Sequence, residues 1–338
     1  MTHEDRLTGA LLGTALGDAL GLPAEGMAAS AITRRFGVLN RFRLLGTMGI
    51  VSDDTEQAAL VAAAVLGSQS AAEAARRLER SLAAWICCLP WGVGRATLLA
   101  CGRSLFRLRP TGVQSAGNGA AMRAGSLGVI FVEQAGARRE YGEALAQVTH
   151  RDPRAVQGAL FVAEVAAGLA RGLAPDAAVQ EGLAVLVAPG LRAGVVRALE
   201  LATEGASRPL AAQELGITGF VQHTVAFAAY CLLRQEGDPL QDLASAISAG
   251  GDTDSIGAIL GCWLGTQHGA DALPRALLDR IQDGPFGPTH LRALARALAQ
   301  RAAGEEAVVP DYSAAYALIR NLLLYPVILA HGFRRLLP

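Results

Sequence analysis

Apolar residues recur at helical spacing along most of the chain. Ala, Leu, Val and Ile return three and four positions apart, as in helices that bury one face, and no alternating β-branched runs indicate a sheet. The pattern predicts helices at 4–21, 53–67, 70–88, 94–106, 153–171, 175–187, 191–204, 220–234, 238–248, 253–268, 272–282, 290–303 and 312–323. We therefore expect an all-α protein, with one domain at 1–304 and a helical extension at 305–338 packed on the same domain.

Two of these segments carry a glycine at every fourth position. The glycines are Gly9, Gly13, Gly17 and Gly21 in the first, and Gly257, Gly261, Gly265 and Gly269 in the second. Each interior glycine costs a helix about 1 kcal/mol relative to alanine, so a row of them indicates close approach by another backbone or a ligand. We expect the two helices to lie against each other near the core centre, which would bring Asp18 and Glu25 towards residue 252.

The periodic pattern disappears between residues 26 and 50. The stretch is expected to be a long loop that begins next to Glu25 and ends next to Ser52. Loops of this length are often functional lids, and disorder is the alternative.

Clusters of oxygen-bearing side chains open two of the apolar helices. The stretch Gly250–Gly257 reads GGDTDSIG, and Ser52 is followed by Asp53, Asp54, Thr55 and Glu56. Carboxylate and hydroxyl oxygens without Cys or His are typical ligands of hard divalent cations such as Mg²⁺ or Mn²⁺.

Helix capping is the alternative interpretation of both clusters. Asp and Ser are common N-caps, and the spacing from Asp53 to Glu56 also fits a capping box. A cap needs one acidic residue, however, whereas each cluster has at least two that would repel each other without a cation between them.

Two further stretches are candidates for ligand contact. Ser115 to Arg123 reads SAGNGAAMR, a glycine-rich loop that feeds a helix and could leave backbone N–H groups free for an anion; a simple turn with a helix cap is the alternative. Thr149 to Pro153 reads THRDP, in which Asp152 is the expected N-cap and Pro153 the first helical residue. His150 could touch a ligand or be structural.

Composition narrows the class of protein. Formal net charge is zero, with 30 basic and 30 acidic residues, so the accumulated positive charge that nucleic-acid or anionic-membrane binding requires is missing. Five cysteines in no metal-type spacing favour a reduced, cytoplasmic protein. The longest apolar stretches, such as 322–330, are expected to be too short to span a bilayer, so we expect a soluble protein. We also expect a monomer.

Six motifs in order resemble those of the ADP-ribosylglycohydrolase family. They read GALLGTALGDALGLPAE, SDDTEQAAL, SAGNGAAMR, THRDPRAVQGA, HTVAFAAYCLL and AISAGGDTDSIGAILGCWLG, and the resemblance runs from about residue 5 to 300. The family includes the glycohydrolase that reactivates dinitrogenase reductase and related hydrolases that remove ADP-ribose from proteins. It implies a compact all-α enzyme with two Mg²⁺ or Mn²⁺ ions held between the two acidic clusters.

The resemblance assigns roles to particular residues. The implied metal ligands or their orienting groups are Ser52, Asp53, Asp54, Asp252, Asp254 and Ser255. Serine stands at Ser52 and Ser255 where the family usually has threonine, and the hydroxyl is retained. Glu25 or Asp252 would transfer the proton. The implied ligand-binding residues are Ser115, Gly117, Asn118, Gly119 and His150.

The implied reaction is hydrolysis at C1 of the distal ribose. That cleavage passes through an oxocarbenium-like state, and two divalent ions can orient the sugar and lower the pKa of a bound water. The leaving group could be arginine, serine, a polymer or a small molecule; the SxGNG form of the loop leans towards O-linked ADP-ribose. Alternatives are a non-catalytic ADP-ribose-binding or crystallin-like protein, and a two-metal phosphoesterase that cuts the diphosphate.

Overall fold

The computed structural model describes residues 1–336, and this part of the chain is overwhelmingly α-helical. The helices in chain order are α1 (His3–Gly21), α2 (Ala29–Phe36), α3 (Asp53–Leu66), α4 (Ala71–Ile86), α5 (Arg95–Leu105), α6 (Gly125–Ile130), α7 (Ala135–Gln147), α8 (Pro153–Ala170), α9 (Pro175–Gly182), α10 (Pro189–Thr203), α11 (Arg208–Leu215), α12 (Val221–Leu233), α13 (Pro239–Ile247), α14 (Thr253–His268), α15 (Arg275–Leu278), α16 (Pro288–Ala302) and α17 (Ala314–Leu336). Short 3-10 turns are η1 (Leu22–Ala24), η2 (Asn118–Ala120), η3 (Leu183–Val185) and η4 (Ala270–Ala272), and the strands β1 (Met27–Ala28) and β2 (Gly250–Gly251) form one antiparallel pair. The expected all-α class is confirmed.

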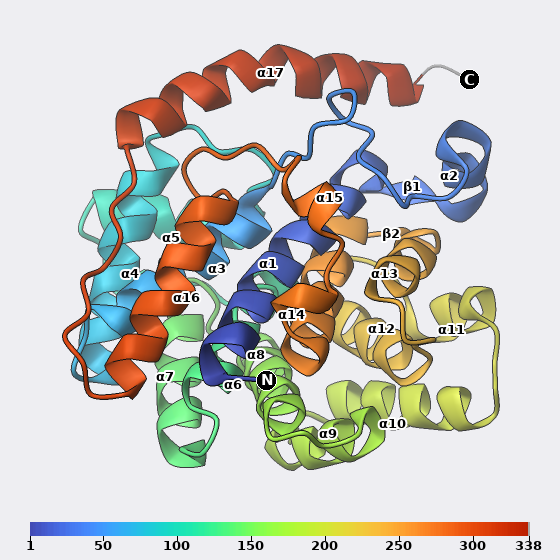
Figure 1. Cartoon of the computed structure of the whole chain (residues 1–338), viewed down its shortest axis with the longest axis horizontal. Helices are drawn as coiled ribbons and strands as arrows, with labels where there is room; N and C mark the ends of the chain where they lie inside the picture. The colour runs from blue at the N-terminus through green and yellow to red at the C-terminus, as the bar shows by residue number, and fades with distance from the viewer. Residues whose placement is uncertain (337–338) are drawn as a thin grey trace.

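Helices α1 and α14 form the centre of the molecule and lie directly against each other (Figure 1). A Cβ atom on Gly13 would lie 2.7 Å from the carbonyl carbon of Gly261, and one on Gly9 would lie 2.8 Å from that of Gly265. Only hydrogen atoms fit into such a contact, so the backbones meet without side chains between them. The predicted pairing of the two glycine-bearing helices is therefore confirmed.

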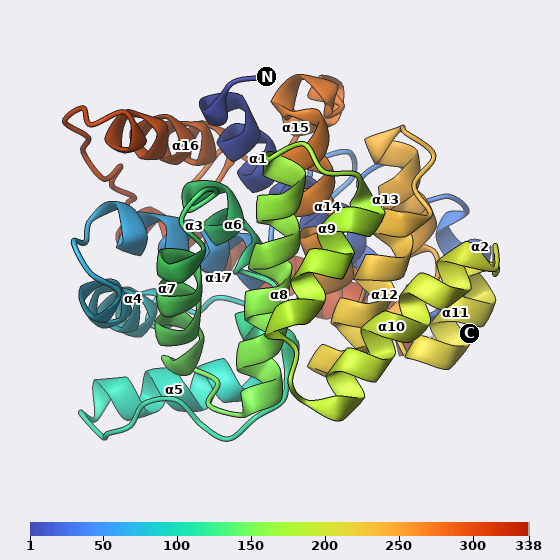
Figure 2. The same cartoon turned by 90° about the horizontal axis from the view of Figure 1, so that it is seen from below.

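Other helices surround this central pair in layers. Helices α3, α6 and α16 pack on α1, whereas α8, α12 and α13 pack on α14. Figure 2 shows α8, α9, α10 and α12 side by side on one face of the molecule. Because other helices cover both central helices, most residues of the pair are buried.

Most expected helices are present, with several differences. Asp152 caps α8 as predicted, with its carboxylate accepting from the Arg154 backbone N–H at 2.9 Å. The structure adds α7 and α11, for which no helix was predicted, and the helix expected after the loop at 115–123 is α6. The expected loop at 26–50 is partly wrong, because β1 and α2 occupy its first third. Ile32 is the buried residue of α2, and one apolar contact is too weak a pattern to recognise from sequence.

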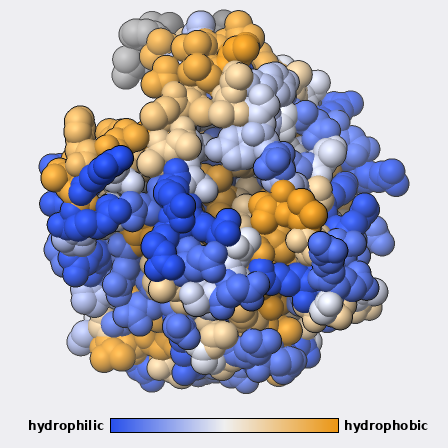
Figure 3. All heavy atoms as spheres, turned by 90° about the vertical axis from the view of Figure 1, so that its left-hand side faces the viewer, coloured by the Kyte–Doolittle hydropathy of each residue, from blue (hydrophilic) through white to orange (hydrophobic). Residues whose placement is uncertain are grey.

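The extension after residue 304 forms one long helix, α17, which crosses the top of the molecule in Figure 1. It continues through Pro326, well beyond the predicted end at 323. Its polar residues face inward: Arg320 pairs with Glu56, and Asn321 donates to the Cys88 carbonyl at 2.7 Å. Its apolar residues Ile319, Leu322 and Leu323 face outward and are mostly exposed. Figure 3 shows apolar side chains gathered at the top of the molecule, where α17 lies.

Two helical stretches of the described chain are long and apolar enough to cross a membrane by length and composition: His3–Ala24 and Ala314–Gly332. The prediction that every apolar stretch is too short is therefore wrong. The first stretch lies almost wholly inside the protein, as a core helix does, and the second is mostly exposed. Length alone does not distinguish a core helix from a membrane span.

Candidate functional site

Helix α3 begins next to the middle of the molecule because Asp18 of α1 holds its first turn. The buried Asp18 carboxylate accepts from the backbone N–H of Ser52 at 2.9 Å and of Thr55 at 3.2 Å, and from the Thr55 hydroxyl at 2.5 Å. The Ser52 hydroxyl caps the helix by accepting from the Asp54 N–H at 3.3 Å. The Asp18 carboxylate thus accepts from the donors at the start of α3. The carboxylates of Asp53 and Asp54 are therefore not needed for that purpose.

Glu56 does not act as the partner in a capping box, so that interpretation is wrong. Its carboxylate accepts from the Trp85 indole N–H at 2.5 Å and forms an ion pair with Arg320 of α17. All three side chains are buried. Glu56 consequently fastens α4 and α17 to α3 and points away from Asp53.

Helix α14 begins after a glycine turn that approaches Glu25. Gly250 and Gly251 have φ of 85° and 77°, a conformation that favours glycine, and they pair with β1. The Gly26 N–H donates to the Gly251 carbonyl at 2.7 Å, which brings Glu25 beside the start of α14. Asp252 occupies the N-cap position without capping the helix through its side chain.

The carboxylates of the two clusters repel one another across this junction. Burial, followed by the charges of neighbouring carboxylates, raises the pKa of Asp53, Asp54 and Asp254 well above the ordinary value. The charge of Asp54 acts on Asp254, although their positions in the sequence are 200 apart. Burial also raises the pKa of Asp18 to about 6. A cation would relieve this repulsion.

These side chains open into a cavity of about 610 Å³. Its walls contain Glu25, Asp53, Asp54, Asp252, Asp254, Ser255, Ser115, Gly117, Asn118, Gly119 and His150. The structure thus brings together every predicted site residue except Ser52, which lies behind the wall as the cap of α3.

The loop at 115–119 binds the side chain of Asp252 and offers few free N–H groups to an anion. Asn118 Nδ2 donates to Asp252 Oδ2 at 2.6 Å and to the Thr224 hydroxyl at 3.0 Å. The Gly117 N–H donates to the Ser115 hydroxyl and the Asn118 N–H to the Gly219 carbonyl. The prediction of free N–H groups is wrong for these two residues, because the protein itself supplies their acceptors.

His150 lies in the wall beside this loop and is buried. Its Nδ1 atom is 2.8 Å from the Thr149 hydroxyl. Burial, together with the charge of Arg123, lowers its pKa to about 3, so the ring is neutral at neutral pH. A Cβ on Gly119 would lie 3.3 Å from His150 Nε2, which shows that this nitrogen faces the glycine loop.

Sequence reasoning missed the wall formed by the start of α5. Arg95 and Thr97 line the cavity, and the N-cap residue Gly94 has no side chain to satisfy the first N–H groups of the helix. Thr97 is buried in this wall, whereas Arg95 is exposed at its rim. Gly92 and Gly94, which precede α5, could have identified this turn from the sequence, because they have the same spacing as Gly117 and Gly119.

The donor set fits a hard divalent cation, although the side chains do not form a closed metal site as they stand. Within the described residues, no three His, Cys, Asp or Glu side chains are close enough together to hold a metal ion. Asp54 Oδ1 is nevertheless buried and has no hydrogen-bond partner in this part of the chain. An unpaired carboxylate oxygen among other buried carboxylates is a strong ligand for Mg²⁺ or Mn²⁺.

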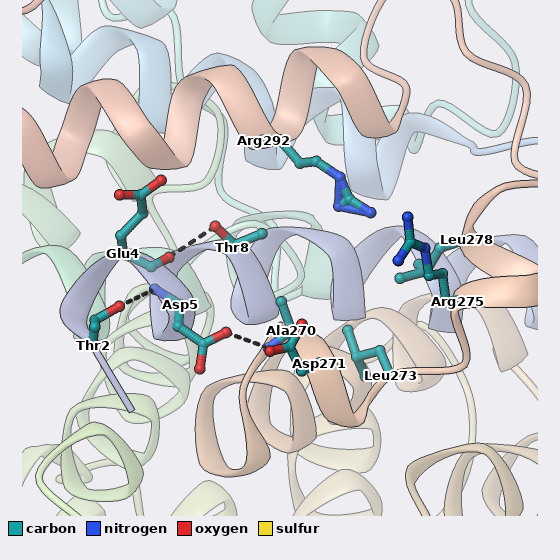
Figure 4. Close-up of a pocket in the computed structure, with 10 residues that line it drawn as sticks. All are labelled: Thr2, Glu4, Asp5, Thr8, Ala270, Asp271, Leu273, Arg275, Leu278 and Arg292. Carbon is teal, nitrogen blue, oxygen red and sulfur yellow. Dashed lines mark hydrogen bonds between the residues drawn. The ribbon is translucent and has the colours of Figure 1, made fainter.

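A second hollow, of about 470 Å³, lies at the other end of α1. Figure 4 shows Glu4 and Asp5 on one side of it, with Arg275 and Arg292 on the other. Asp5 already accepts from the Ala270 N–H at 3.0 Å, so it fixes the turn after α14. The residues of this hollow stabilise helix ends. The buried carboxylates that could bind a cation line the cavity of about 610 Å³ described above.

Comparison with known proteins agrees with this geometry. The model of the ADP-ribosylglycohydrolase family matches residues 1–307. An uncharacterised protein of Archaeoglobus fulgidus is 30% identical over 295 residues, which cover 84% of this chain and 93% of that protein. The ADP-ribosyl-[dinitrogen reductase] glycohydrolase of Rhodospirillum rubrum is 25% identical over 290 residues, covering 82% of this chain and 90% of that protein.

Structural comparison gives the same family. A solved structure described as an ADP-ribosylglycohydrolase-related protein complex superposes with a TM-score of 0.69 at 26% identity, covering 88% of this chain and 98% of that chain. Helix α17 lies outside the matched residues of the family model. This chain belongs to the ADP-ribosylglycohydrolase family.

Proposed function

We propose that the protein hydrolyses the bond at C1 of the distal ribose in ADP-ribosylated proteins and releases ADP-ribose. The substrate linkage would be O-linked to serine or N-linked to arginine. The observation that carries this proposal is the meeting of Asp53, Asp54 and Asp254, all buried, at one wall of a cavity large enough for a nucleotide-sized ligand. A purely structural site would gain nothing from their mutual repulsion.

Two divalent cations, Mg²⁺ or Mn²⁺, would be held by this wall. Asp53, Asp54 and Asp254 would be ligands, with Asp252 and Ser255 at the edge of the same wall. Ser52 would contribute by fixing the first turn of α3. When bound, such ions polarise sugar hydroxyls and lower the pKa of a bound water.

Glu25 and Asp252 are the candidates for proton transfer. Both line the cavity, and Glu25 also lines a small adjoining hollow next to Gly92. Asn118 Nδ2 donates to one oxygen of Asp252 at 2.6 Å, which restrains the carboxylate at the cavity wall. A general base must be within hydrogen-bond reach of the attacking water, and both carboxylates line the cavity in which that water would lie.

The diphosphate would lie at the start of α5. The Arg95 guanidinium, the Thr97 hydroxyl and the first N–H groups of the helix supply positive charge and donors there. Helix N-termini favour phosphate because their N–H groups and dipole point at the ligand. The loop at 115–119 would then contact the ribose of the ligand. The N–H groups of Gly117 and Asn118 in this loop already donate to acceptors within the protein.

The test is the release of ADP-ribose from ADP-ribosyl-serine and ADP-ribosyl-arginine peptides, with and without Mg²⁺. We expect metal-dependent release from at least one peptide, reduced at least a hundredfold in Asp254→Asn. Asp176→Asn is the matched control, because Asp176 is an exposed acid in the first turn of α9, away from the cavity.

The product distinguishes this function from its alternatives. AMP in place of ADP-ribose would identify a diphosphate-cleaving enzyme. Binding of ADP-ribose without release from either peptide would point to a binding protein or to hydrolysis of a small ADP-ribose derivative. An assay with an acetyl ester of ADP-ribose would distinguish these two, because only the hydrolase would release ADP-ribose from it.

A further inference from the structure

A buried arginine behind the cavity connects two of its walls. Arg123, between η2 and α6, is 2% exposed. Its Nη1 donates to Gln57 Oε1 at 2.5 Å, and its Nη2 donates to the Thr149 hydroxyl at 2.7 Å and to the Leu145 carbonyl at 3.2 Å. Its hydrogen-bond acceptors in the described chain are all neutral, and the charge of Asp53 acts on it without a direct contact.

The first arm of this network reaches the acidic cluster. Because Gln57 Oε1 accepts from Arg123, the Gln57 amide nitrogen must face the other way, and it donates to Asp53 Oδ2 at 2.7 Å. The guanidinium thereby orients Asp53 without touching it. Burying a charge costs several kcal/mol, so a site that needed only packing would use an apolar residue here.

The second arm determines where His150 carries its proton. A guanidinium only donates, so the Thr149 oxygen is an acceptor towards Arg123. Thr149 is completely buried, and His150 Nδ1 is the one acceptor within reach of its hydroxyl hydrogen in the described residues. If Nδ1 carried a proton instead, the hydroxyl hydrogen would be buried without an acceptor, which is unfavourable.

We propose that Arg123 is a positioning residue that acts through Thr149 to keep the proton of His150 on Nε2. His150 then presents an N–H donor to the cavity beside Gly117 and Gly119. A donor at this point selects an oxygen acceptor on the ligand, such as a ribose hydroxyl or a phosphate oxygen. The identity of that ligand rests on the proposed function, whereas the position of the proton does not.

The direct test is nitrogen NMR on the whole protein labelled with ¹⁵N-histidine. Six histidines give a simple long-range ¹H–¹⁵N spectrum, and His150→Gln assigns the resonance. Wild type and Thr149→Ser, which keeps the hydroxyl, should show a bare Nδ1 and a protonated Nε2. Thr149→Val and Arg123→Met should show a mixture of the two neutral tautomers. Protonated Nδ1 in the wild type, or an unchanged tautomer in either folded variant, would overturn the proposal.

Two measurements keep this test decisive. Circular dichroism checks folding, and Thr149→Val, which changes shape least, decides the matter if Arg123→Met does not fold. Calorimetry should show ADP-ribose affinity about tenfold weaker in Thr149→Val and unchanged in Thr149→Ser, as expected for one impaired hydrogen bond. A wild type with the Nε2 proton but no affinity for ADP-ribose would refute the proposed function and leave the proton assignment standing.

Discussion

The glycine contact between α1 and α14 gives the sharpest prediction about stability. In Gly13→Ala the new Cβ would lie 2.7 Å from the Gly261 carbonyl carbon and nearer still to its oxygen, whereas ordinary contact begins at 3.4 Å. The atoms in the way are backbone atoms of a helix, so no side chain can turn aside. The two helices must separate at the centre of the core.

The expected cost follows from that separation. Moving packed surfaces apart by about 1 Å forfeits roughly a quarter to a half of the dispersion energy at the contact, and overpacked cores lose about 1–3 kcal/mol or more. Alanine returns about 1 kcal/mol through its higher helix propensity. Because Gly9 and Gly17 make equally close contacts on either side, tilting cannot relieve the clash, so we take the upper end of that range and expect a net loss of about 2 kcal/mol.

Thermal unfolding measures this loss against a matched control. For a chain of 338 residues, about 2 kcal/mol corresponds to a melting temperature roughly 3 °C lower. Gly102 also lies inside a helix, α5, but an added Cβ there meets open space. Gly102→Ala should therefore raise the melting temperature by about 1 °C. A Gly13→Ala protein that melts at or above the wild-type temperature would refute the close-contact explanation.

Three further predictions concern buried charges. Arg320→Ala leaves Glu56 buried without its cation and should cost about 3–5 kcal/mol in urea unfolding, most of which Glu56→Gln should restore in the double variant; no loss would show that the pair is immaterial. Asp54→Asn should raise the metal-free stability at pH 7 by on the order of 1 kcal/mol, seen as a higher melting temperature, because folding raises the pKa of Asp54 and ionisation above the ordinary value of 3.8 therefore favours the unfolded chain. The same variant should lose the stabilisation by Mg²⁺, and a lower metal-free melting temperature would contradict the repulsion. The lowered pKa of His150, about 3, means that the unfolded chain binds a proton below pH 6.5 that the folded chain does not. Its stability contribution is thus complete above pH 6.5 and falls by about 1.4 kcal/mol per pH unit towards pH 3, relative to His150→Gln; parallel pH profiles would argue against a buried neutral ring.

The local pattern of the sequence determined the helices and the kind of chemistry. Helical spacing of apolar residues is a property of neighbouring positions, so most helices could be predicted. Glycine at every fourth position has few explanations other than close backbone contact, and the contact of α1 with α14 followed from it. Oxygen-rich clusters at residues 52–56 and 252–255 likewise indicated a cation site. The motifs are enough to indicate the family without the tertiary structure.

Tertiary structure decided how these residues are used, because each use depends on a partner distant in sequence. Glu56 has the spacing of a capping box, yet Trp85 and Arg320 take its carboxylate. Asn118 could have offered a free N–H group, but folding brings the Gly219 carbonyl to it as an acceptor. Hydrogen bonds and burial arise between elements that the chain places together only after it folds. The sequence determined which groups are present, and the packing determined which of them are left free for a ligand.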